Sequence, residues 1–296
     1  MERSMGTTIF VIGASGHIGA ALLEALAGAD ARVIAGAHSA ESAARLAADG
    51  VEAARIDLGD RASLVQAFKG AERLFLMTPL LERMAEYAAN AVEAAKETGI
   101  AHIVRSSVLG ASEAAEYKLG AVHGGIDAAV RASGIPWTLL LPNCFMQNFR
   151  DSYGRMIVNS DAIFLPQGSG KTSFIDVRDA AACAAAALLA PERHAGRTYE
   201  LTGPEALSGG EAAAIIGEAR GAPVTYIDIP ALIARGAVLR KGMPAWNVEM
   251  LLSFFAYIKA GKAAGVTNAV EELTGRKART LREYARENAR AWEPEL

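Results

Sequence analysis

Apolar residues in the first half of the chain form short continuous runs, separated by longer stretches with helical spacing. The run 7–12 is apolar or β-branched throughout and ends at Gly13. A strand covered on both faces of a parallel sheet has this pattern, because neither set of alternating side chains meets water. Similar runs predict five further strands, at 32–37, 51–57, 74–77, 102–105 and 137–141.

Between these runs, apolar positions recur every three or four residues, as on one face of an α-helix. Leu22 and Leu26 mark such a face, and Gly28 closes the segment. Gly99 and Gly134 follow two later helical stretches, at the position where glycine commonly ends a helix. Six strand–helix alternations with short connections predict an α/β fold, a Rossmann-type doubly wound parallel sheet of six or seven strands.

The rhythm changes after Pro142. Short strands are predicted near 162–165, 172–175 and 198–201, between helices that begin at Asp176 and Gly210, and a late amphipathic helix carries Leu251, Phe254, Phe255 and Ile258. No repeat or low-complexity linker separates independent units. We therefore divide the chain by role into a Rossmann core, 1–142, and a smaller, mostly helical substrate region, 143–296, with returning elements that complete the core.

Charge and cysteine content exclude several classes of protein. The chain has 30 basic and 33 acidic residues and a net charge of −3, without the basic stripe that nucleic-acid binding requires. Cys144 and Cys183 lack metal-ligand and disulfide spacing, so we expect two buried thiols and no metal site. The longest apolar run, 180–190, is shorter than the about 20 residues that span a bilayer. We expect a cytoplasmic protein without membrane partners, whose oligomeric state no pattern specifies.

Three glycines directly after the first strand predict a dinucleotide site. Gly13 permits a sharp exit from the strand, Gly16 lets backbone approach a pyrophosphate, and Gly19 lets the helix pack close to the strand. The start of the following helix offers free N–H groups and a partial positive charge to phosphates. The strand–loop–helix context makes this motif specific, whereas glycines alone would be weak evidence.

The end of the second strand bears on the choice between NAD and NADP. A carboxylate there would bind the ribose 2′-hydroxyl and repel a 2′-phosphate. The chain instead has His38 and Ser39, with no acid before Glu41, so we expect NADP(H) to be preferred and NAD(H) to be possible. Asp57 and Leu58, after the third strand, are expected at the adenine edge.

Several segments together resemble the NmrA-like family of atypical short-chain dehydrogenases and reductases, which includes triphenylmethane reductase and NADPH-dependent quinone reductases. These segments are VIGASGHIG, LFLMTP, IVRSSVLGAS, SGIPWTLLLPNCFMQNF, SFIDVRDAA and VTNAVEELTGRKARTLREYA. The resemblance covers nearly the whole chain and is specific for the family rather than for a substrate. The loop spacing G-x-x-G-x-x-G is the form found in atypical members.

The resemblance also implies roles for individual residues. It implies that the pyrophosphate is lined by Gly13, Ser15, Gly16, His17 and Ile18. It places around the nicotinamide Thr78, Pro79, Ser106 and Ser107, and it makes Pro142 a cofactor-binding residue at the start of the substrate wall. It begins the substrate wall with Asn143, Phe145 and Met146. The chain departs from the family at His38 and Ser39, where members that prefer NADP often carry an arginine.

The Tyr-x-x-x-Lys pair of typical short-chain dehydrogenases is absent. Tyr117, predicted to lie in a loop, has Ala121 four residues later. His123 is the remaining candidate for donating a proton or a hydrogen bond to a substrate oxygen, and Asp127 lies four residues on, where its carboxylate could hold the imidazole. A surface or packing histidine beside a solvated aspartate is the competing explanation.

Two functions are consistent with these features. The first is an NAD(P)H-dependent oxidoreductase that delivers hydride to a conjugated or aromatic acceptor, such as a quinone, an enone or a dye. Such acceptors stabilise the added negative charge themselves, which would explain the missing Tyr–Lys pair. The alternative is a non-catalytic NAD(P)-binding redox sensor or regulator, which also needs no such pair.

Overall fold

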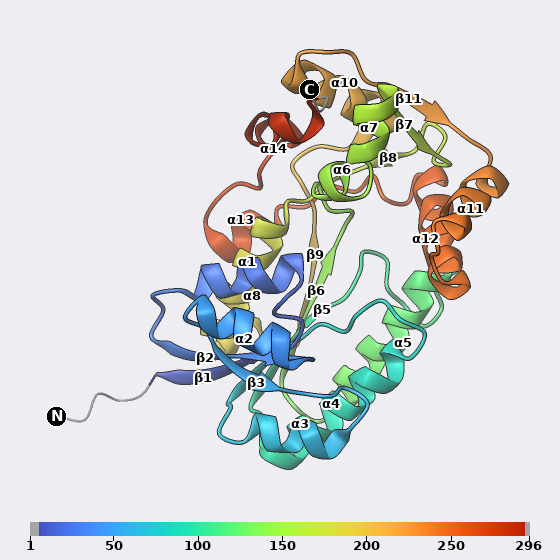
Figure 1. Cartoon of the computed structure of the whole chain (residues 1–296). Helices are drawn as coiled ribbons and strands as arrows, with labels where there is room; N and C mark the ends of the chain where they lie inside the picture. Colours follow the sequence, from blue (N-terminus) through green and yellow to red (C-terminus); the bar gives the residue numbers. More distant parts are fainter. Residues whose placement is uncertain (1–5, 294–296) are drawn as a thin grey trace.

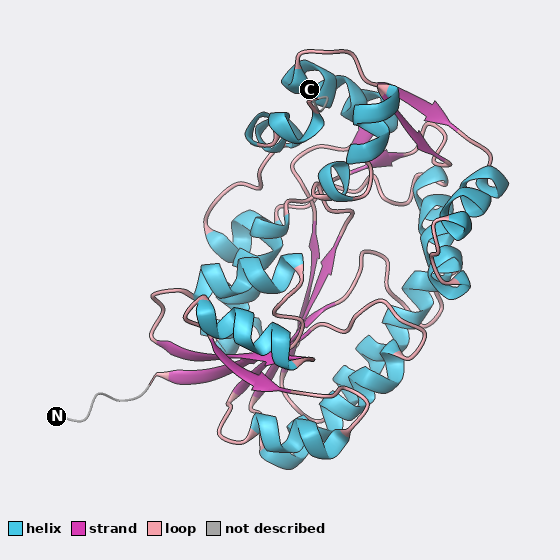
Figure 2. Cartoon of the chain, in the orientation of Figure 1, coloured by secondary structure: helices cyan, strands magenta, loops and turns pink. Residues whose placement is uncertain are grey.

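The computed structural model describes residues 6–293, and its centre is a seven-stranded, all-parallel sheet (Figures 1 and 2). The strand order is β3-β2-β1-β4-β5-β6-β9, and each neighbouring pair is parallel. The strands are β1 (Thr7–Val11), β2 (Ala31–Ala37), β3 (Glu52–Arg55), β4 (Arg73–Leu76), β5 (His102–Ser106), β6 (Trp137–Pro142) and β9 (Arg197–Leu201). The predicted doubly wound α/β sheet is confirmed.

Helices cover both faces of this sheet (Figure 1). One face carries α1 (His17–Leu26), α2 (Ala40–Ala48), α8 (Val177–Leu189) and α13 (Ala269–Thr274). The other carries α3 (Arg61–Phe68), α4 (Met84–Thr98) and α5 (Lys118–Ala132). Alternate residues of β1 enter the two cores, Ile9 and Val11 on the α1 side and Phe10 on the α4 side. This two-sided burial explains the continuous apolar runs.

Elements after β6 form a second region with its own core. Apart from α8, α13, β9 and the short helix α9 (Pro191–His194), which lie with the main sheet, they are α6 (Asn148–Asp151), α7 (Gly154–Ser160), β7 (Ala162–Leu165), β8 (Lys171–Thr172), β10 (Leu207–Ser208), α10 (Gly209–Arg220), β11 (Thr225–Asp228), α11 (Ala231–Arg240), α12 (Ala245–Lys259), α14 (Leu281–Glu287) and a 3₁₀ turn (Ala289–Trp292). Two small sheets, β7–β11 and β8–β10, pack with these helices around an aromatic-rich core.

The later part of the chain also returns to the main sheet. β9 extends the sheet beside β6, and α8 packs against α1 over its face. The start of α8 agrees with the prediction, because Asp176 caps it by accepting a hydrogen bond from the Arg178 N–H at 2.8 Å. The predicted strand 172–175 is limited to Lys171–Thr172, followed by an isolated bridge at Ile175. The division of roles at residue 142 remains a prediction.

Two further observations concern residue environment. Cys144 and Cys183 are both buried and free, as expected. Tyr117 does not lie in an exposed loop: it is the N-cap of α5, is 7% exposed and donates its hydroxyl hydrogen to the Leu109 carbonyl. Its ring packs against that of Tyr257 of α12, with the ring centroids 4.3 Å apart and the planes tilted by 31°, which explains the burial. Within residues 6–293, none of the helices combines the length and the apolar character needed to cross a bilayer.

Candidate dinucleotide-binding site

The loop between β1 and α1 is built around glycines with different structural duties. Gly13 has a φ of 81°, in the left-handed region that favours glycine. A Cβ at Gly19 would lie 2.1 Å from the Gly13 carbonyl oxygen, so only glycine lets α1 pack this close to the turn. Gly16 is different, because its backbone is extended and a Cβ there would meet its nearest atom at an ordinary 3.4 Å. The fold therefore does not require glycine at position 16.

Among residues 6–293, no side chain caps the start of α1. Gly16 is the N-cap and has no side chain to satisfy the first N–H groups, and the first turn holds no acidic residue. Free N–H groups and the helix dipole together attract an anion. The open space at Gly16 lies directly beside them. This arrangement fits a pyrophosphate.

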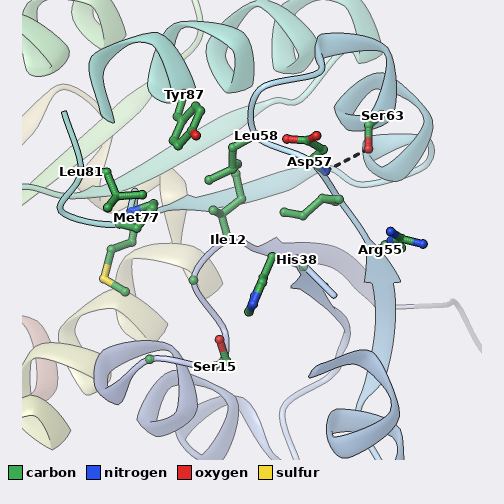
Figure 3. Close-up of a pocket in the computed structure, with 15 residues that line it drawn as sticks. Ile12, Ser15, His38, Arg55, Asp57, Leu58, Ser63, Met77, Leu81 and Tyr87 are labelled. Atoms are coloured by element: carbon green, nitrogen blue, oxygen red, sulfur yellow. Dashed lines mark hydrogen bonds between the residues drawn. The ribbon is translucent and has the colours of Figure 1, made fainter. Parts of the chain in front are cut away.

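A cavity of about 800 Å³ opens beside this loop at the carboxyl ends of the strands (Figure 3). Its lining comprises Ile12, Gly13, Ser15, Gly16, Gly36, His38, Arg55, Ile56, Asp57, Leu58, Ser63, Met77, Pro79, Leu81 and Tyr87. These residues come from the ends of β1, β2, β3 and β4 and from the segments that follow them. In an open parallel sheet this edge is where ligands bind. The cavity volume is in the range of cofactor sites.

Apolar side chains form the end of the cavity near α4. Leu58, Leu81 and Tyr87 lie there, and the Arg83 guanidinium stacks over the Tyr87 ring at 5.1 Å. Asp57 is held in place, because its N–H donates to Ser63 Oγ at 3.0 Å and its Oδ1 accepts from the Gly59 N–H at 2.8 Å. A flat apolar wall with one fixed carboxylate fits an adenine ring. The residues present therefore fit a dinucleotide.

The structure brings only some of the predicted cofactor residues to this cavity. Those that line it are Gly13, Ser15, Gly16, His38, Asp57, Leu58 and Pro79. Ile18 lies on the buried face of α1, and the Ser39 hydroxyl accepts from the Ser42 N–H to cap α2. His17 is exposed, and its Nε2 lies 3.2 Å from an Asp151 carboxylate oxygen of α6. These three side chains lie outside the cavity lining.

Sequence reasoning missed Arg55, Met77, Leu81 and Tyr87. Arg55 had a detectable signal, because a charged residue at the end of a strand faces the carboxyl edge of the sheet. Leu81 and Tyr87 belong to the segment after β4 and the first turns of α4, and no local pattern distinguishes them from core residues.

The residues expected around the nicotinamide lie deeper. Thr78, Ser106, Ser107 and Pro142 follow or end β4, β5 and β6, so they share one edge of the sheet, and all four are buried. The Thr78 hydroxyl oxygen has no hydrogen-bond partner within the described residues. The Ser107 hydroxyl donates to Asp127 at 2.5 Å. An unpartnered buried hydroxyl at this edge marks a position where a ligand group would find a partner.

A buried arginine organises the residues beneath this edge. Arg105 of β5 is fully buried; its Nη2 donates to His123 Nδ1 at 3.2 Å, and its Nε lies 3.5 Å from Asp127. Asp127 therefore faces Arg105 and Ser107, and the expectation that it holds His123 is wrong. The physical reason is charge: a buried guanidinium attracts the carboxylate more strongly than a neutral imidazole does.

This arrangement also fixes the state of His123. Burial and the nearby Arg105 cation lower the pKa of His123 to about 3, so the imidazole is neutral at pH 7. Because a guanidinium only donates, Nδ1 must be the acceptor and the ring hydrogen lies on Nε2. Burial lowers the pKa of Arg105 only to about 10, so its charge persists. His123 can donate a hydrogen bond but holds no imidazolium proton at neutral pH.

The expected substrate wall is largely internal. The Asn143 amide donates to Ser173 Oγ at 2.8 Å and to the Ala263 carbonyl at 2.9 Å. Met146 is 1% exposed within the second core, and Phe145 is half-buried against the first. None of the three lines the 800 Å³ cavity, which extends from the glycine loop to the apolar side chains near α4. Their contact with a substrate stays a prediction.

Comparison with known proteins identifies relatives that match over the full fold. A family model described as the NmrA-like family matches residues 5–287. The NAD(P)H azoreductase of Xenophilus azovorans is 36% identical over 284 residues, which cover 96% of this chain and 99% of the relative.

Two solved structures share this architecture. The NADPH-dependent quinone oxidoreductase of Escherichia coli in complex with NADPH has a TM-score of 0.85 at 26% identity, covering 94% of this chain and 99% of that chain. The triphenylmethane reductase of Citrobacter sp. in complex with NADP(H) has a TM-score of 0.84 at 26% identity, covering 95% and 99% of the two chains.

Proposed function

We propose that this chain, which belongs to the NmrA-like family, is an NAD(P)H-dependent reductase that delivers hydride to a conjugated or aromatic acceptor such as a quinone, an enone or a dye. The main observation behind the proposal is one cavity that extends from the glycine loop to an apolar end that fits an adenine ring. Similarity to an azoreductase, a quinone oxidoreductase and a triphenylmethane reductase supports the acceptor class. NADP(H) is the preferred cofactor, and NAD(H) is also accepted.

The protein's own contribution is binding, orientation and exclusion of water. A reduced nicotinamide, when bound, supplies the hydride. The N–H groups at the start of α1 would hold the pyrophosphate, and Leu58, Leu81 and Tyr87 would hold the adenine. Thr78, buried after β4, would offer its unpartnered hydroxyl to the nicotinamide end of the cofactor. Fixing both reactants in this way lowers the entropic part of the barrier.

Proton handling follows from the Arg105 cluster. His123 stays neutral and offers an Nε2–H hydrogen bond rather than a transferable proton. Hydride addition converts a quinone to a phenolate, which takes its proton from water, and converts a cationic triphenylmethane dye to a neutral product, so neither acceptor needs a residue poised near neutral pH. The absence of the Tyr–Lys pair is consistent with this chemistry.

Steady-state oxidation of NADPH against a panel of quinones, enones, azo dyes and triphenylmethane dyes tests the proposal. We expect saturable turnover with at least one class. Saturable NADPH binding without turnover across the panel would instead support the redox sensor. No binding of either reduced cofactor would refute the dinucleotide site itself.

The role of His123 is tested separately with His123→Gln and His123→Ala. If His123 only donates a hydrogen bond, kcat falls by less than about tenfold in the alanine variant, and the glutamine variant retains more activity. His123→Gln should then show the same pH dependence of kcat between about pH 5 and 8 as the unmodified protein, because burial and Arg105 keep His123 neutral over that range. A loss of about 100-fold or more with a pH-dependent limb would show that His123 transfers a proton.

A further inference from the structure

Two basic side chains, at the ends of β2 and β3, line the cavity. β2 itself contributes no carboxylate there. Strand register pairs Ala37 of β2 with Arg55 of β3, so Arg55 lies beside the last residue of β2, one residue before His38. Both side chains line the cavity, although they are distant in sequence. In Figure 3, Arg55 lies on the side of the cavity away from Met77 and Leu81. The nearest acid after β2 is Glu41, which lies on α2 and does not line the cavity.

The Arg55 guanidinium is available for a ligand. Arg55 is exposed and has no ion-pair partner among residues 6–293. Glu52 of the same strand is bonded to Arg32, whose Nε donates to it at 2.8 Å. The Asp57 carboxylate is occupied by the Gly59 N–H. An unpaired arginine at the rim of a cofactor cavity offers its planar set of donors to an anion.

Other candidates for binding an anion here are already engaged. The Ser39 hydroxyl caps α2. Arg83 donates to Glu86 through Nε at 2.8 Å and does not line the cavity. Arg55 and His38 are therefore the basic side chains that the cavity lining offers to an anion at this end.

We propose that Arg55 recognises the 2′-phosphate of NADP(H), so that the determinant of cofactor choice is supplied from β3 rather than from the end of β2. The inference rests on the proposed function. The adenosine ribose of a dinucleotide lies at the end of the second strand in this fold, where a carboxylate would select NAD and an arginine nearby accommodates the 2′-phosphate. His38 supplies a second, weaker donor from β2. Residues 37–39 contain no arginine, so they alone indicate a weaker preference for NADP(H) than we expect once Arg55 is included.

Calorimetric titration of Arg55→Gln with NADPH and with NADH tests this assignment. We expect the Kd for NADPH to rise about tenfold or more, because a charge-assisted bond to phosphate is lost, while the Kd for NADH changes less than about twofold. Arg55→Lys keeps the charge but not the planar fork and should lie between the two. Arg61→Gln is the matched control: Arg61 is exposed, pairs with Glu97 at 2.6 Å and does not line the cavity, so neither Kd should change.

Titration with cofactor fragments isolates the phosphate. Adenosine 2′,5′-bisphosphate should bind the unmodified protein more tightly than adenosine 5′-monophosphate, and Arg55→Gln should remove most of that difference. An unchanged NADPH to NADH ratio in Arg55→Gln, or an equal loss for both cofactors, would overturn the assignment while leaving the dinucleotide site intact. If the unmodified protein binds neither cofactor, the proposed function fails, and this inference fails with it.

Discussion

At the scale of single residues, the glycines of the loop between β1 and α1 have two different roles, one in packing and one in ligand binding. Gly19 is required by the fold, since its Cβ would contact the Gly13 carbonyl oxygen, whereas Gly16 has room for a Cβ. The glycine at position 16 is explained by a ligand that approaches the backbone. Two glycines of one motif are therefore distinguishable by experiment.

We expect Gly16→Ala to weaken NADPH binding about tenfold or more and to lower the free energy of unfolding by no more than about 1 kcal/mol, the cost of alanine at an N-cap. Gly19→Ala should lower the free energy of unfolding by about 1–3 kcal/mol, because α1 must shift. Gly125→Ala on α5, where nothing lies within 4 Å of the added Cβ, should not destabilise the protein. Urea unfolding and calorimetry measure both quantities. Normal NADPH binding by Gly16→Ala would contradict this explanation.

A second residue-scale prediction concerns acid sensitivity. His102 is 2% exposed, and burial, aided by the Arg73 cation, lowers the pKa of His102 to about 4. Thr138 donates its hydroxyl hydrogen to the His194 carbonyl at 2.8 Å, so its oxygen accepts from His102 Nε2 at 3.0 Å. A neutral imidazole satisfies this arrangement.

Because the unfolded pKa of histidine is about 6.5, the unfolded chain binds the extra proton between about pH 6.5 and 4. The stability contributed by neutral His102 is present above that range and is lost as the pH falls through it. Urea unfolding at pH 7.5 and at pH 5 should show His102 costing about 2 kcal/mol at the lower pH. His102→Gln should lose correspondingly less stability over the same interval. An equal loss in both proteins would show that His102 is not held neutral.

At the scale of elements, the 3₁₀ turn Ala289–Trp292 packs the end of the described chain against the second core. Trp292 is fully buried, its Nε1 donates to the Phe149 carbonyl at 2.9 Å, and its ring meets Tyr284 edge-on. This one side chain connects α6, α14 and the turn.

Trp292→Ala should lower the free energy of unfolding by about 3–5 kcal/mol, because it leaves a large cavity. Trp292→Phe keeps most of the packing but leaves the Phe149 carbonyl without its donor, for a loss of about 1–3 kcal/mol. The cavity residues belong to other elements, so NADPH affinity of the folded variants should stay within about twofold. A larger change in affinity than in stability would indicate that the second core shapes the cofactor site.

Another element-scale lesson comes from α5. Spacing alone placed Asp127 where it could hold His123, and both residues do lie on that helix. The choice of partner was decided by Arg105 on β5, because helix periodicity does not report which charge faces the helix from a neighbouring strand. Arg105 in the apolar run 102–105 was the available signal, since a lone charge in a doubly covered strand must find a buried partner.

At the scale of the whole molecule, the sheet is completed by the part of the chain assigned to substrate binding. α8 and α13 cover the same face as α1, and β9 pairs with β6. The first 142 residues would expose this face and an unpaired edge strand.

We therefore predict that a fragment of residues 1–142 does not fold cooperatively, whereas the full chain does. Circular dichroism during urea unfolding distinguishes a sigmoidal transition from a gradual loss of signal. A fragment that unfolds cooperatively and binds NADPH would show that the division at residue 142 is an independent domain boundary rather than a division of roles.

The sequence by itself determined the first six strands of the main sheet, the fold class and the glycine loop. Each of these follows from local patterns: the continuous burial of doubly covered strands, helical periodicity and the backbone freedom of glycine. It also indicated Asp57, Leu58 and His38, because they follow the ends of predicted strands.

Only the tertiary structure decided which distant residues meet. Strand register places Arg55 beside the end of β2. Packing of α5 against β5 brings Asp127 to within 3.5 Å of Arg105, and β9, from the later part of the chain, pairs with β6. These contacts depend on packing between elements that are far apart in the chain. A local pattern specifies the faces of an element, but the partner of each face is chosen by the free energy of the whole fold.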